Sequence, residues 1–266
     1  EKTLIPFANK LSQNKVLKAI SGGFSALLPV IMVGAIASLL SGLNIEAYQN
    51  FIVAIGLKPI VAYISAYTTN MMAIYAVFSI GNSMAKQLEC KDQSILVGII
   101  SLMVFLLTIP LGVTKDEVTI AAAISTTYFG APGLFTAMII GCIVPLIYNI
   151  FVKNHIVIKM PDGVPPQIAN GFSAIIPAVC ITAIFAAIRQ LCALTSFGTL
   201  SGLIYGLLKT PLSHLTNSPI TFVVLLLFCN ILWFFGIHGG MVTMSFLSML
   251  YMAPALENLE AMAAGQ

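Results

Sequence analysis

Long stretches without a charged residue dominate the pattern of hydrophobic and polar positions along the chain. A helix needs about 20 mostly apolar residues to cross the hydrocarbon core of a bilayer. Most of the stretches can therefore span, and two could each hold more than one element. The stretches free of Lys, Arg, Asp and Glu are residues 19–45, 59–85, 93–114, 118–152, 163–188, 190–208 and 210–256.

These stretches do not alternate between apolar and polar positions. Residues 95–100 (ILVGII) and 223–228 (VVLLLF) are apolar on every side. The strands of a closed β-barrel, the other architecture that can span a membrane, do alternate. The sequence therefore predicts an all-α fold, a polytopic transmembrane helical protein with about six to seven spans plus interfacial or re-entrant segments.

The breaks between apolar stretches predict where the individual spans lie. Residues 46–66 form either a short span or a helix at the interface, because Glu46, Lys58 and Pro59 interrupt them. The turn-forming residues 128–133 (YFGAPG) favour a short or re-entrant piece before the next span. The predicted spans are residues 20–42, 68–85, 94–113, 134–152, 171–192 and 220–236, with an interfacial or re-entrant stretch at 197–217 and a final apolar segment from Gly239 that Pro254 interrupts.

The most polar internal stretch, residues 153–166 (KNHIVIKMPDGVPP), predicts a boundary between two halves. The sequence GFSALLP at 23–29 recurs as GFSAIIP at 171–177. Transporters are often built from such repeats, with substrate bound between them; the alternative is that small residues and Pro recur by chance at helix entries. We expect an N-terminal transmembrane half (1–152), a polar connecting segment (153–170) and the first part of a second, substrate-binding half (171–266).

Composition and charge agree with a membrane location. Only 8% of the residues are charged and 59% are hydrophobic, whereas about a quarter of the residues of a soluble domain are charged. The net charge of +3 comes from lysines near the ends of the apolar stretches, and no basic patch indicates nucleic acid. Four lysines precede the first predicted span, which places the N-terminus in the cytoplasm.

The cysteines and the familiar catalytic motifs give no sign of chemistry. The five cysteines form no CxxC pair and have no His at metal-binding spacing, so we expect reduced core thiols and no metal site. Phosphate loops, zinc-protease motifs and nucleophile elbows do not occur in the sequence. We therefore predict no catalytic residue and no cofactor, and energy for transport has to come from an ion gradient or from another polypeptide.

His238 is the outstanding polar residue in the second half. Gly236, Gly239 and Gly240 permit an unwound backbone around it, and Trp233 adds an aromatic face. Irregular backbone at membrane depth is tolerated where it lines a wet cavity, and this combination suits a neutral sugar. The alternative is that His238 only hydrogen-bonds a neighbouring helix and Trp233 lies in an interfacial aromatic belt. The predicted substrate-binding residues are His238, Trp233, Gly239 and Asn230; polar residues near span ends, such as Asn70, are expected to serve helix packing.

Three segments resemble a known family. They are LKAISGGF at 17–24, KMPDGVPP at 159–166 and WFFGIHG at 233–239. Together they resemble the membrane-spanning C component of the lactose/cellobiose-type sugar phosphotransferase system, and the resemblance runs through the entire chain. It implies a multi-pass, homodimeric permease of the bacterial inner membrane whose N-terminal half dimerises. Such a permease binds a disaccharide of the cellobiose, lactose or chitobiose class and presents it for phosphoryl transfer from a phosphocysteine of a partner B component, with no complete catalytic site of its own.

By this resemblance His238 hydrogen-bonds the sugar near the hydroxyl that is phosphorylated, and Trp233 lines the pocket. Family members are longer, and a later segment of theirs contributes a second re-entrant hairpin and a glutamate that acts with the histidine. Nothing here matches that segment, since Glu257 and Glu260 follow too closely on His238. We therefore expect this chain to lack the C-terminal part. Two alternatives stay open: an ion-coupled secondary transporter of a small polar solute, which would need a buried acidic residue, and a membrane scaffold that does not transport.

Overall fold

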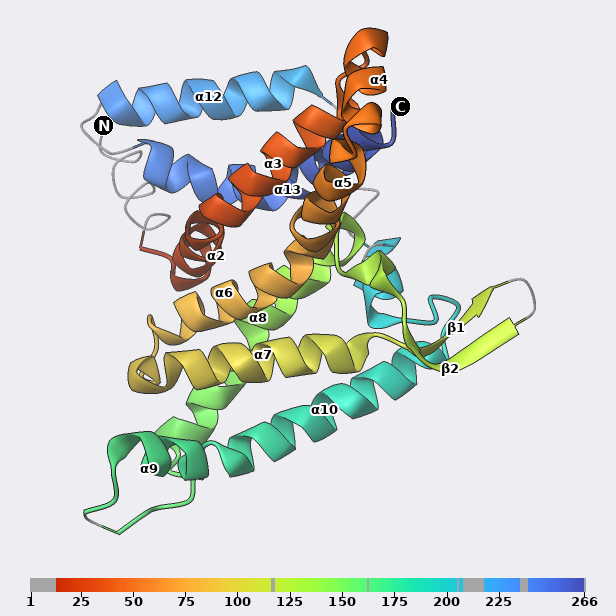
Figure 1. Ribbon diagram of the computed structural model, residues 1–266. Helices are drawn as coiled ribbons and strands as arrows, with labels where there is room; N and C mark the ends of the chain where they lie inside the picture. Colours follow the sequence, from red (N-terminus) through yellow and green to blue (C-terminus); the bar gives the residue numbers. More distant parts are fainter. Residues whose placement is uncertain are drawn as a thin grey trace.

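The computed structural model describes residues 13–265 except 116–117, 162, 205, 208–217 and 235–238. Helices make up nearly all of the regular structure, and they lie as rods crossing one another around α6 and α8 (Figure 1). The elements are α2 (Lys15–Ala26), α3 (Leu28–Gly42), α4 (Glu46–Ala54), α5 (Leu57–Tyr67), η1 (Thr69–Met71), α6 (Met72–Ala85), η2 (Lys91–Gln93), α7 (Ser94–Thr108), β1 (Leu111–Lys115), β2 (Val118–Ile124), η3 (Thr126–Tyr128), α8 (Ala131–Lys153), α9 (Pro166–Ser173), α10 (Ile175–Ala193), α12 (Pro219–Phe234) and α13 (Gly239–Ala263).

The predicted helical membrane fold is confirmed. Within the described part of the chain, four helical stretches are long and apolar enough to cross a membrane, or five if the bent pair α2 and α3 counts as one span. With the shorter apolar stretch Pro219–Ile231 of α12, this roughly agrees with the predicted six to seven spans. The four stretches are Leu57–Ala85, Lys91–Thr108, Ala131–Lys153 and Pro166–Ala193.

The first two predicted segments are each divided into two helices in the structure. The span expected at 20–42 is bent by 52° between α2 and α3. Pro29 lies in the first turn of α3, where its missing N–H costs nothing but where a helix arriving from α2 cannot continue straight. The ambiguous stretch 46–66 divides into α4, which is short, and α5, which continues through η1 and α6 as one candidate span.

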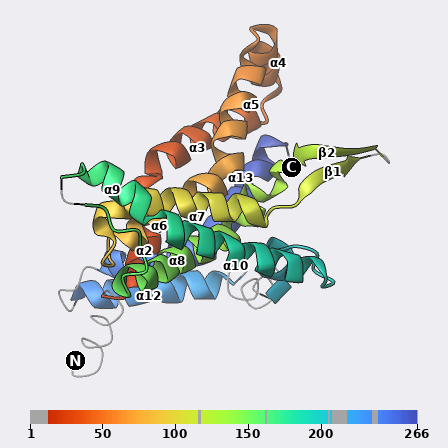
Figure 2. The same cartoon turned by 90° about the horizontal axis from the view of Figure 1, so that it is seen from below.

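A small β-hairpin replaces the short or re-entrant piece expected before the span at 134–152. β1 pairs with β2 in antiparallel register, with Leu111 opposite Ile124 and Val113 opposite Ile120. The β-branched residues Val113, Ile120 and Ile124 favour strands, and Pro110 ends the helix before them. The span predicted at 94–113 accordingly ends at Thr108, and the hairpin projects from the helices (Figure 2).

Helix α13 corrects another prediction. The last apolar segment was expected to be interrupted at Pro254, but α13 runs unbroken from Gly239 to Ala263. Neighbouring elements can compensate for the hydrogen bond that a proline removes inside a membrane helix. α13 packs against α2, α3 and α8 as well as against α12. The last described helix therefore contacts the first two described helices, α2 and α3.

Helix α6 is the centre of the packing because small residues let its neighbours approach closely. It contacts α2, α7 and α8. At the crossing with α2, a Cβ placed on Gly23 would lie 2.5 Å from Ile80 Cγ1, and the Ser79 hydroxyl donates a hydrogen bond of 2.8 Å to the Gly23 carbonyl. Close backbone approach through small residues is typical of helix association in membranes. Gly22 lies against Ser83, whereas Gly23 lies against Ile80, so α2 and α6 run antiparallel.

The outer surface of the helices is strongly apolar. Met32 on α3 is 56% exposed, Ile99 on α7 is 50% exposed and Leu191 on α10 is 64% exposed. Exposed apolar surface of this extent is unusual for a soluble monomer and is expected of a protein whose solvent is lipid.

Most of the described lysines gather at one end of the helices, which we call the lysine end. The start of α2, the connection from α6 to α7 and the end of α8 all lie there. The Lys153 ammonium is 3.1 Å from a carboxylate oxygen of Glu89, and the Asn149 side-chain oxygen accepts from the backbone N–H of Glu89 at 3.1 Å. The described lysines of this end are Lys15, Lys18, Lys86, Lys91, Lys153 and Lys159; Lys58, Lys115 and Arg189 belong to segments toward the opposite end.

A hydrogen-bonded group at the lysine end fastens α9 to the first half of the chain. Gln93 donates to the side chains of Asn170, at 3.2 Å, and Ser173, at 2.8 Å. The buried Tyr148 hydroxyl donates to Gln93 Oε1 at 2.7 Å. The amide of Gln93 thus links α8 to α9 with both of its polar atoms, at the point where the polar connecting segment ends.

Candidate functional site

The four predicted sugar-binding residues come from α12, from the start of α13 and from the segment between them. These two helices pack side by side (Figure 1), and the rings of Phe222 and Tyr251 meet edge to face with centroids 5.6 Å apart. Trp233 belongs to the last turn of α12, and Gly239 is the first residue of α13. His238 and the side chain of Trp233 lie outside the described residues, so their roles stay predictions.

Asn230 is the predicted site residue whose side chain the structure describes. It is exposed on α12, and its Nδ2 donates a hydrogen bond of 2.8 Å to the backbone carbonyl of Leu226 one turn earlier. An amide held this way keeps its oxygen available as an acceptor.

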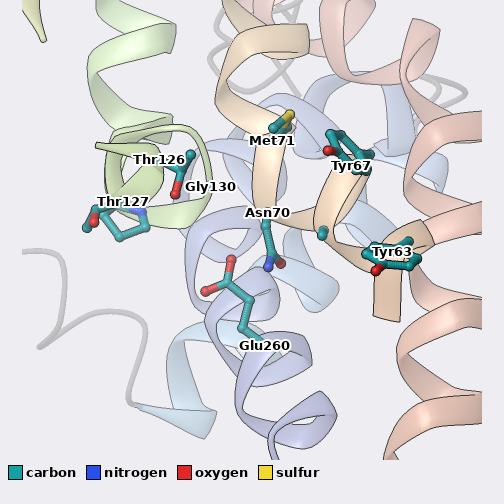
Figure 3. Close-up of a pocket in the computed structure, with 10 residues that line it drawn as sticks. Tyr63, Tyr67, Asn70, Met71, Thr126, Thr127, Gly130 and Glu260 are labelled. Atoms are coloured by element: carbon teal, nitrogen blue, oxygen red, sulfur yellow. The ribbon is translucent and has the colours of Figure 1, made fainter. Parts of the chain in front are cut away.

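A second polar feature is a cavity of about 500 Å³ between segments far apart in the sequence (Figure 3). We call it the Tyr63 cavity. Its volume falls within the roughly 300–1,000 Å³ typical of small-molecule pockets. It is lined from α5, η1, η3, the start of α8 and the end of α13, by Tyr63, Ala66, Tyr67, Asn70, Met71, Thr126, Thr127, Gly130, Pro132 and Glu260.

Glu260 reaches the Tyr63 cavity because α13 packs against α8. Its carboxylate accepts a hydrogen bond from the backbone N–H of Ala131, in the first turn of α8. Gly130, the residue before that helix, makes room: a Cβ there would lie 2.8 Å from a Glu260 carboxylate oxygen. α8 has no side-chain cap and no acidic residue in its first turn, so the carboxyl group of Glu260 takes the place of a capping side chain at this helix N-terminus.

Two tyrosines form the opposite wall. Tyr63 and Tyr67 are four residues apart on α5 and therefore lie on one helix face. Both are more than 60% exposed. The amide of Asn70 and the carboxylate of Glu260 point toward one another between this wall and the threonines of η3 (Figure 3). The cavity thus combines aromatic faces with an amide, hydroxyls and one carboxylate.

Sequence reasoning did not find this cavity. Asn70 was expected to be a helix-packing residue, and Glu260 was considered only as a substitute for a glutamate of longer relatives. The spacing of Tyr63 and Tyr67 was a usable local signal. No local pattern, however, indicated that Glu260 would meet Asn70, since 190 residues separate them.

These observations define a polytopic helical membrane protein with a polar cavity between its helices, and comparisons with known proteins identify its family. The family model "Phosphotransferase system, EIIC" matches residues 21–266. The oligo-beta-mannoside-specific EIIC component of Bacillus subtilis (strain 168) is 30% identical over 267 residues, which cover 99% of this chain and 60% of that protein. The lactose-specific EIICB component of Staphylococcus aureus (strain COL) is 30% identical over 272 residues, covering 98% of this chain and 45% of that protein.

A solved structure agrees. The crystal structure of the transporter ChbC, the IIC component from the N,N'-diacetylchitobiose-specific phosphotransferase system, matches with a TM-score of 0.92 and 31% identity. The match covers 100% of this chain and 63% of ChbC. The chain belongs to the EIIC family of the phosphotransferase system, as the resemblance implied. It spans about 60% of the length of the B. subtilis relative.

Proposed function

We propose that the chain forms the membrane-spanning part of a sugar permease in a phosphoenolpyruvate-dependent phosphotransferase system. The match of the EIIC family model to residues 21–266 is the observation that carries this proposal. The likeness to ChbC along the whole chain adds that the helices are arranged as in a transporter of that system. The protein sits in the bacterial inner membrane.

The proposed substrate is a disaccharide of the cellobiose, lactose or chitobiose class. The relatives' names contain oligo-beta-mannoside, lactose and N,N'-diacetylchitobiose, which are all built of two or more sugar rings. The glycine-flanked segment around His238 suits such a ligand, because His238 can donate and accept hydrogen bonds while Trp233 offers a stacking face. Gly239 and Asn230 complete the proposed site. Gly239 lets the backbone approach the sugar closely, and Asn230 supplies a side-chain amide.

The proposed partner is a phosphorylated B component on the cytoplasmic side. The S. aureus relative is named as an EIICB component, which joins both parts in one protein. We place the lysine end in the cytoplasm, with the N-terminus, because basic residues favour that side of a membrane. α13 then begins at the cytoplasmic end with Gly239, a proposed site residue, on the side from which the phosphoryl group arrives.

The remaining features of the proposal concern assembly. We assign residues 1–152 to a dimerising transmembrane half, 153–170 to the connecting segment and 171–266 to the first part of the substrate-binding half. The exposed apolar faces of α3 and α5 can serve a homodimer contact or lipid. The Gln93 hydrogen bonds to Asn170 and Ser173 join α9 to the first half, on both sides of the proposed boundary at 170.

The deciding experiment measures binding of cellobiose, lactose and N,N'-diacetylchitobiose to the purified protein in lipid nanodiscs. His238→Ala is expected to weaken binding of the preferred sugar by about 1–3 kcal/mol, the usual cost of leaving a polar partner unpaired. His155→Asn is the matched control, because His155 is exposed and has a φ of 56°, a conformation that Asn tolerates. Binding of none of the sugars would contradict the proposal.

Uptake distinguishes the permease from an ion-coupled transporter. Sugar should accumulate as its phosphate, and only when a phosphorylated B component is present. Accumulation of unmodified sugar that collapses with the proton or sodium gradient would favour the secondary transporter instead.

A further inference from the structure

The Tyr63 cavity lies far from the start of α13, where the proposed sugar-binding residue Gly239 is located. Glu260 and Gly239 belong to one helix, α13, and are 21 residues apart. At 1.5 Å per residue they are separated by roughly 30 Å along that helix. The cavity is therefore a place that the proposed sugar site does not use.

The cavity also lies at the end of the molecule away from the lysines. α8 begins beside it at Ala131 and ends at Lys153, which is 23 residues or about 35 Å of helix. α6 likewise begins beyond η1 and ends at the lysine end. With the lysine end in the cytoplasm, the cavity faces the outer side of the membrane.

The lining selects an uncharged, hydroxyl-rich ligand. Among the described lining residues there is no Lys, Arg or His, and the one ionisable acid is Glu260, so an anion such as a phosphate is disfavoured. The amide of Asn70 and the hydroxyl of Thr126 can each donate and accept. Carboxylate oxygens of Glu260 accept from ligand hydroxyls, and the exposed rings of Tyr63 and Tyr67 can cover the C–H face of a sugar ring.

We propose that the Tyr63 cavity is an outer capture site that binds a neutral sugar ring of the transported substrate before the sugar reaches the segment around His238. This inference rests on the proposed function, since the permease reaction supplies the ligand. α13 connects the two places, with Glu260 in the outer cavity and Gly239 beside the inner segment. The other role for the tyrosines is membrane anchoring in an interfacial aromatic belt, which would leave sugar affinity unaffected by their replacement.

Cysteine protection in nanodiscs tests the capture site with the whole chain. Thr126→Cys is introduced in a background in which the part-exposed Cys180 and Cys229 are replaced by Ser. The rate of maleimide labelling is measured with and without the sugar that the protein binds. At a concentration ten times the dissociation constant, labelling is expected to slow about tenfold, because the fraction of empty sites falls by that factor. Ser196→Cys, exposed and outside the cavity, should react at an unchanged rate.

Variants of Tyr63 separate direct contact from an indirect effect. Tyr63→Leu removes the aromatic face and should raise the half-protecting sugar concentration about three- to tenfold, whereas Tyr63→Phe keeps the face and should behave almost as the wild type. Because Tyr63 is 66% exposed, neither change should impair folding. His238→Ala should leave the protection in place.

Trp233 is the single tryptophan of the chain, so its fluorescence reports separately on the inner segment. A sugar that changes this fluorescence without protecting Thr126→Cys would overturn the capture site and leave the proposed function intact. Protection that Tyr63→Leu does not shift would overturn it as well. A sugar that changes neither signal at any soluble concentration would refute both proposals.

Discussion

Two glycines at the same place in the internal repeat should respond in opposite ways to alanine. Gly23 and Gly171 both precede Phe-Ser-Ala, and both lie in helices, α2 and α9. A Cβ on Gly23 would meet Ile80 at 2.5 Å from Cγ1, 2.9 Å from Cα and 3.0 Å from the backbone N. A Cβ on Gly171 would meet nothing within 4 Å.

The distances give the expected magnitudes. Carbon atoms pack best at about 3.5–4.0 Å, so Gly23→Ala requires α2 and α6 to separate by roughly 1 Å, and the backbone atoms of Ile80 cannot rotate away. Overpacking of this kind costs about 1–3 kcal/mol. Both substitutions also gain about 0.5–1 kcal/mol of helix propensity. Gly171→Ala should therefore stabilise slightly, and the two variants should differ by about the full steric cost, 1–3 kcal/mol.

The difference can be measured as the free energy of unfolding in mixed micelles of dodecyl maltoside and SDS, followed by circular dichroism. The two substitutions add the same atoms, so their difference isolates the contact with Ile80. If the two variants differed by less than about 0.5 kcal/mol, which is the scale of an ordinary surface substitution, the reasoning from close helix approach would be refuted.

Two further predictions concern the lysine end. Burial raises the pKa of the Cys90 thiol to about 11, so the folded state resists ionisation that the unfolded chain undergoes near pH 9. Stability should fall between pH 9 and 11, and less so in Cys90→Ser; an identical fall in both proteins would contradict the assignment. Tyr148→Phe should cost about 1 kcal/mol by removing its hydrogen bond to Gln93, and Gln93→Leu about 1–3 kcal/mol because the buried hydroxyl then lacks a partner. A double-mutant cycle with no coupling would refute the pairing.

The class of the fold was predictable because membrane spans are a local property. A stretch such as 134–152 is recognisable from its own composition, and the structure has α8 there, beginning three residues earlier. The predictions were wrong where tertiary packing or backbone hydrogen bonding, rather than the composition of a stretch, decided its structure. Hydropathy did not distinguish the strands β1 and β2 from a re-entrant helix, and it did not show that α13 would continue through Pro254 with α2, α3 and α8 packed beside it.

The two candidate sites also differ in whether a local sequence pattern reveals them. His238 and Trp233 were found because a polar residue among glycines in an apolar stretch stands out in the sequence itself, and their part in binding stays a prediction. The Tyr63 cavity could not be found in that way. Tyr63, Thr126 and Glu260 are ordinary residues in their own segments, and they share a cavity only because α5, η3 and α13 meet.

The sequence by itself determined that this protein is a helical membrane protein, which segments can cross the bilayer and which family it resembles. The first two properties follow from the cost of placing charge in hydrocarbon, which acts on each stretch independently. The resemblance rests on the segments 17–24, 159–166 and 233–239. Only the tertiary structure decided which glycine of the repeat lies against Ile80 and which carboxylate caps α8. Such contacts depend on how whole helices pack, and packing joins residues whose separation along the chain carries no local pattern.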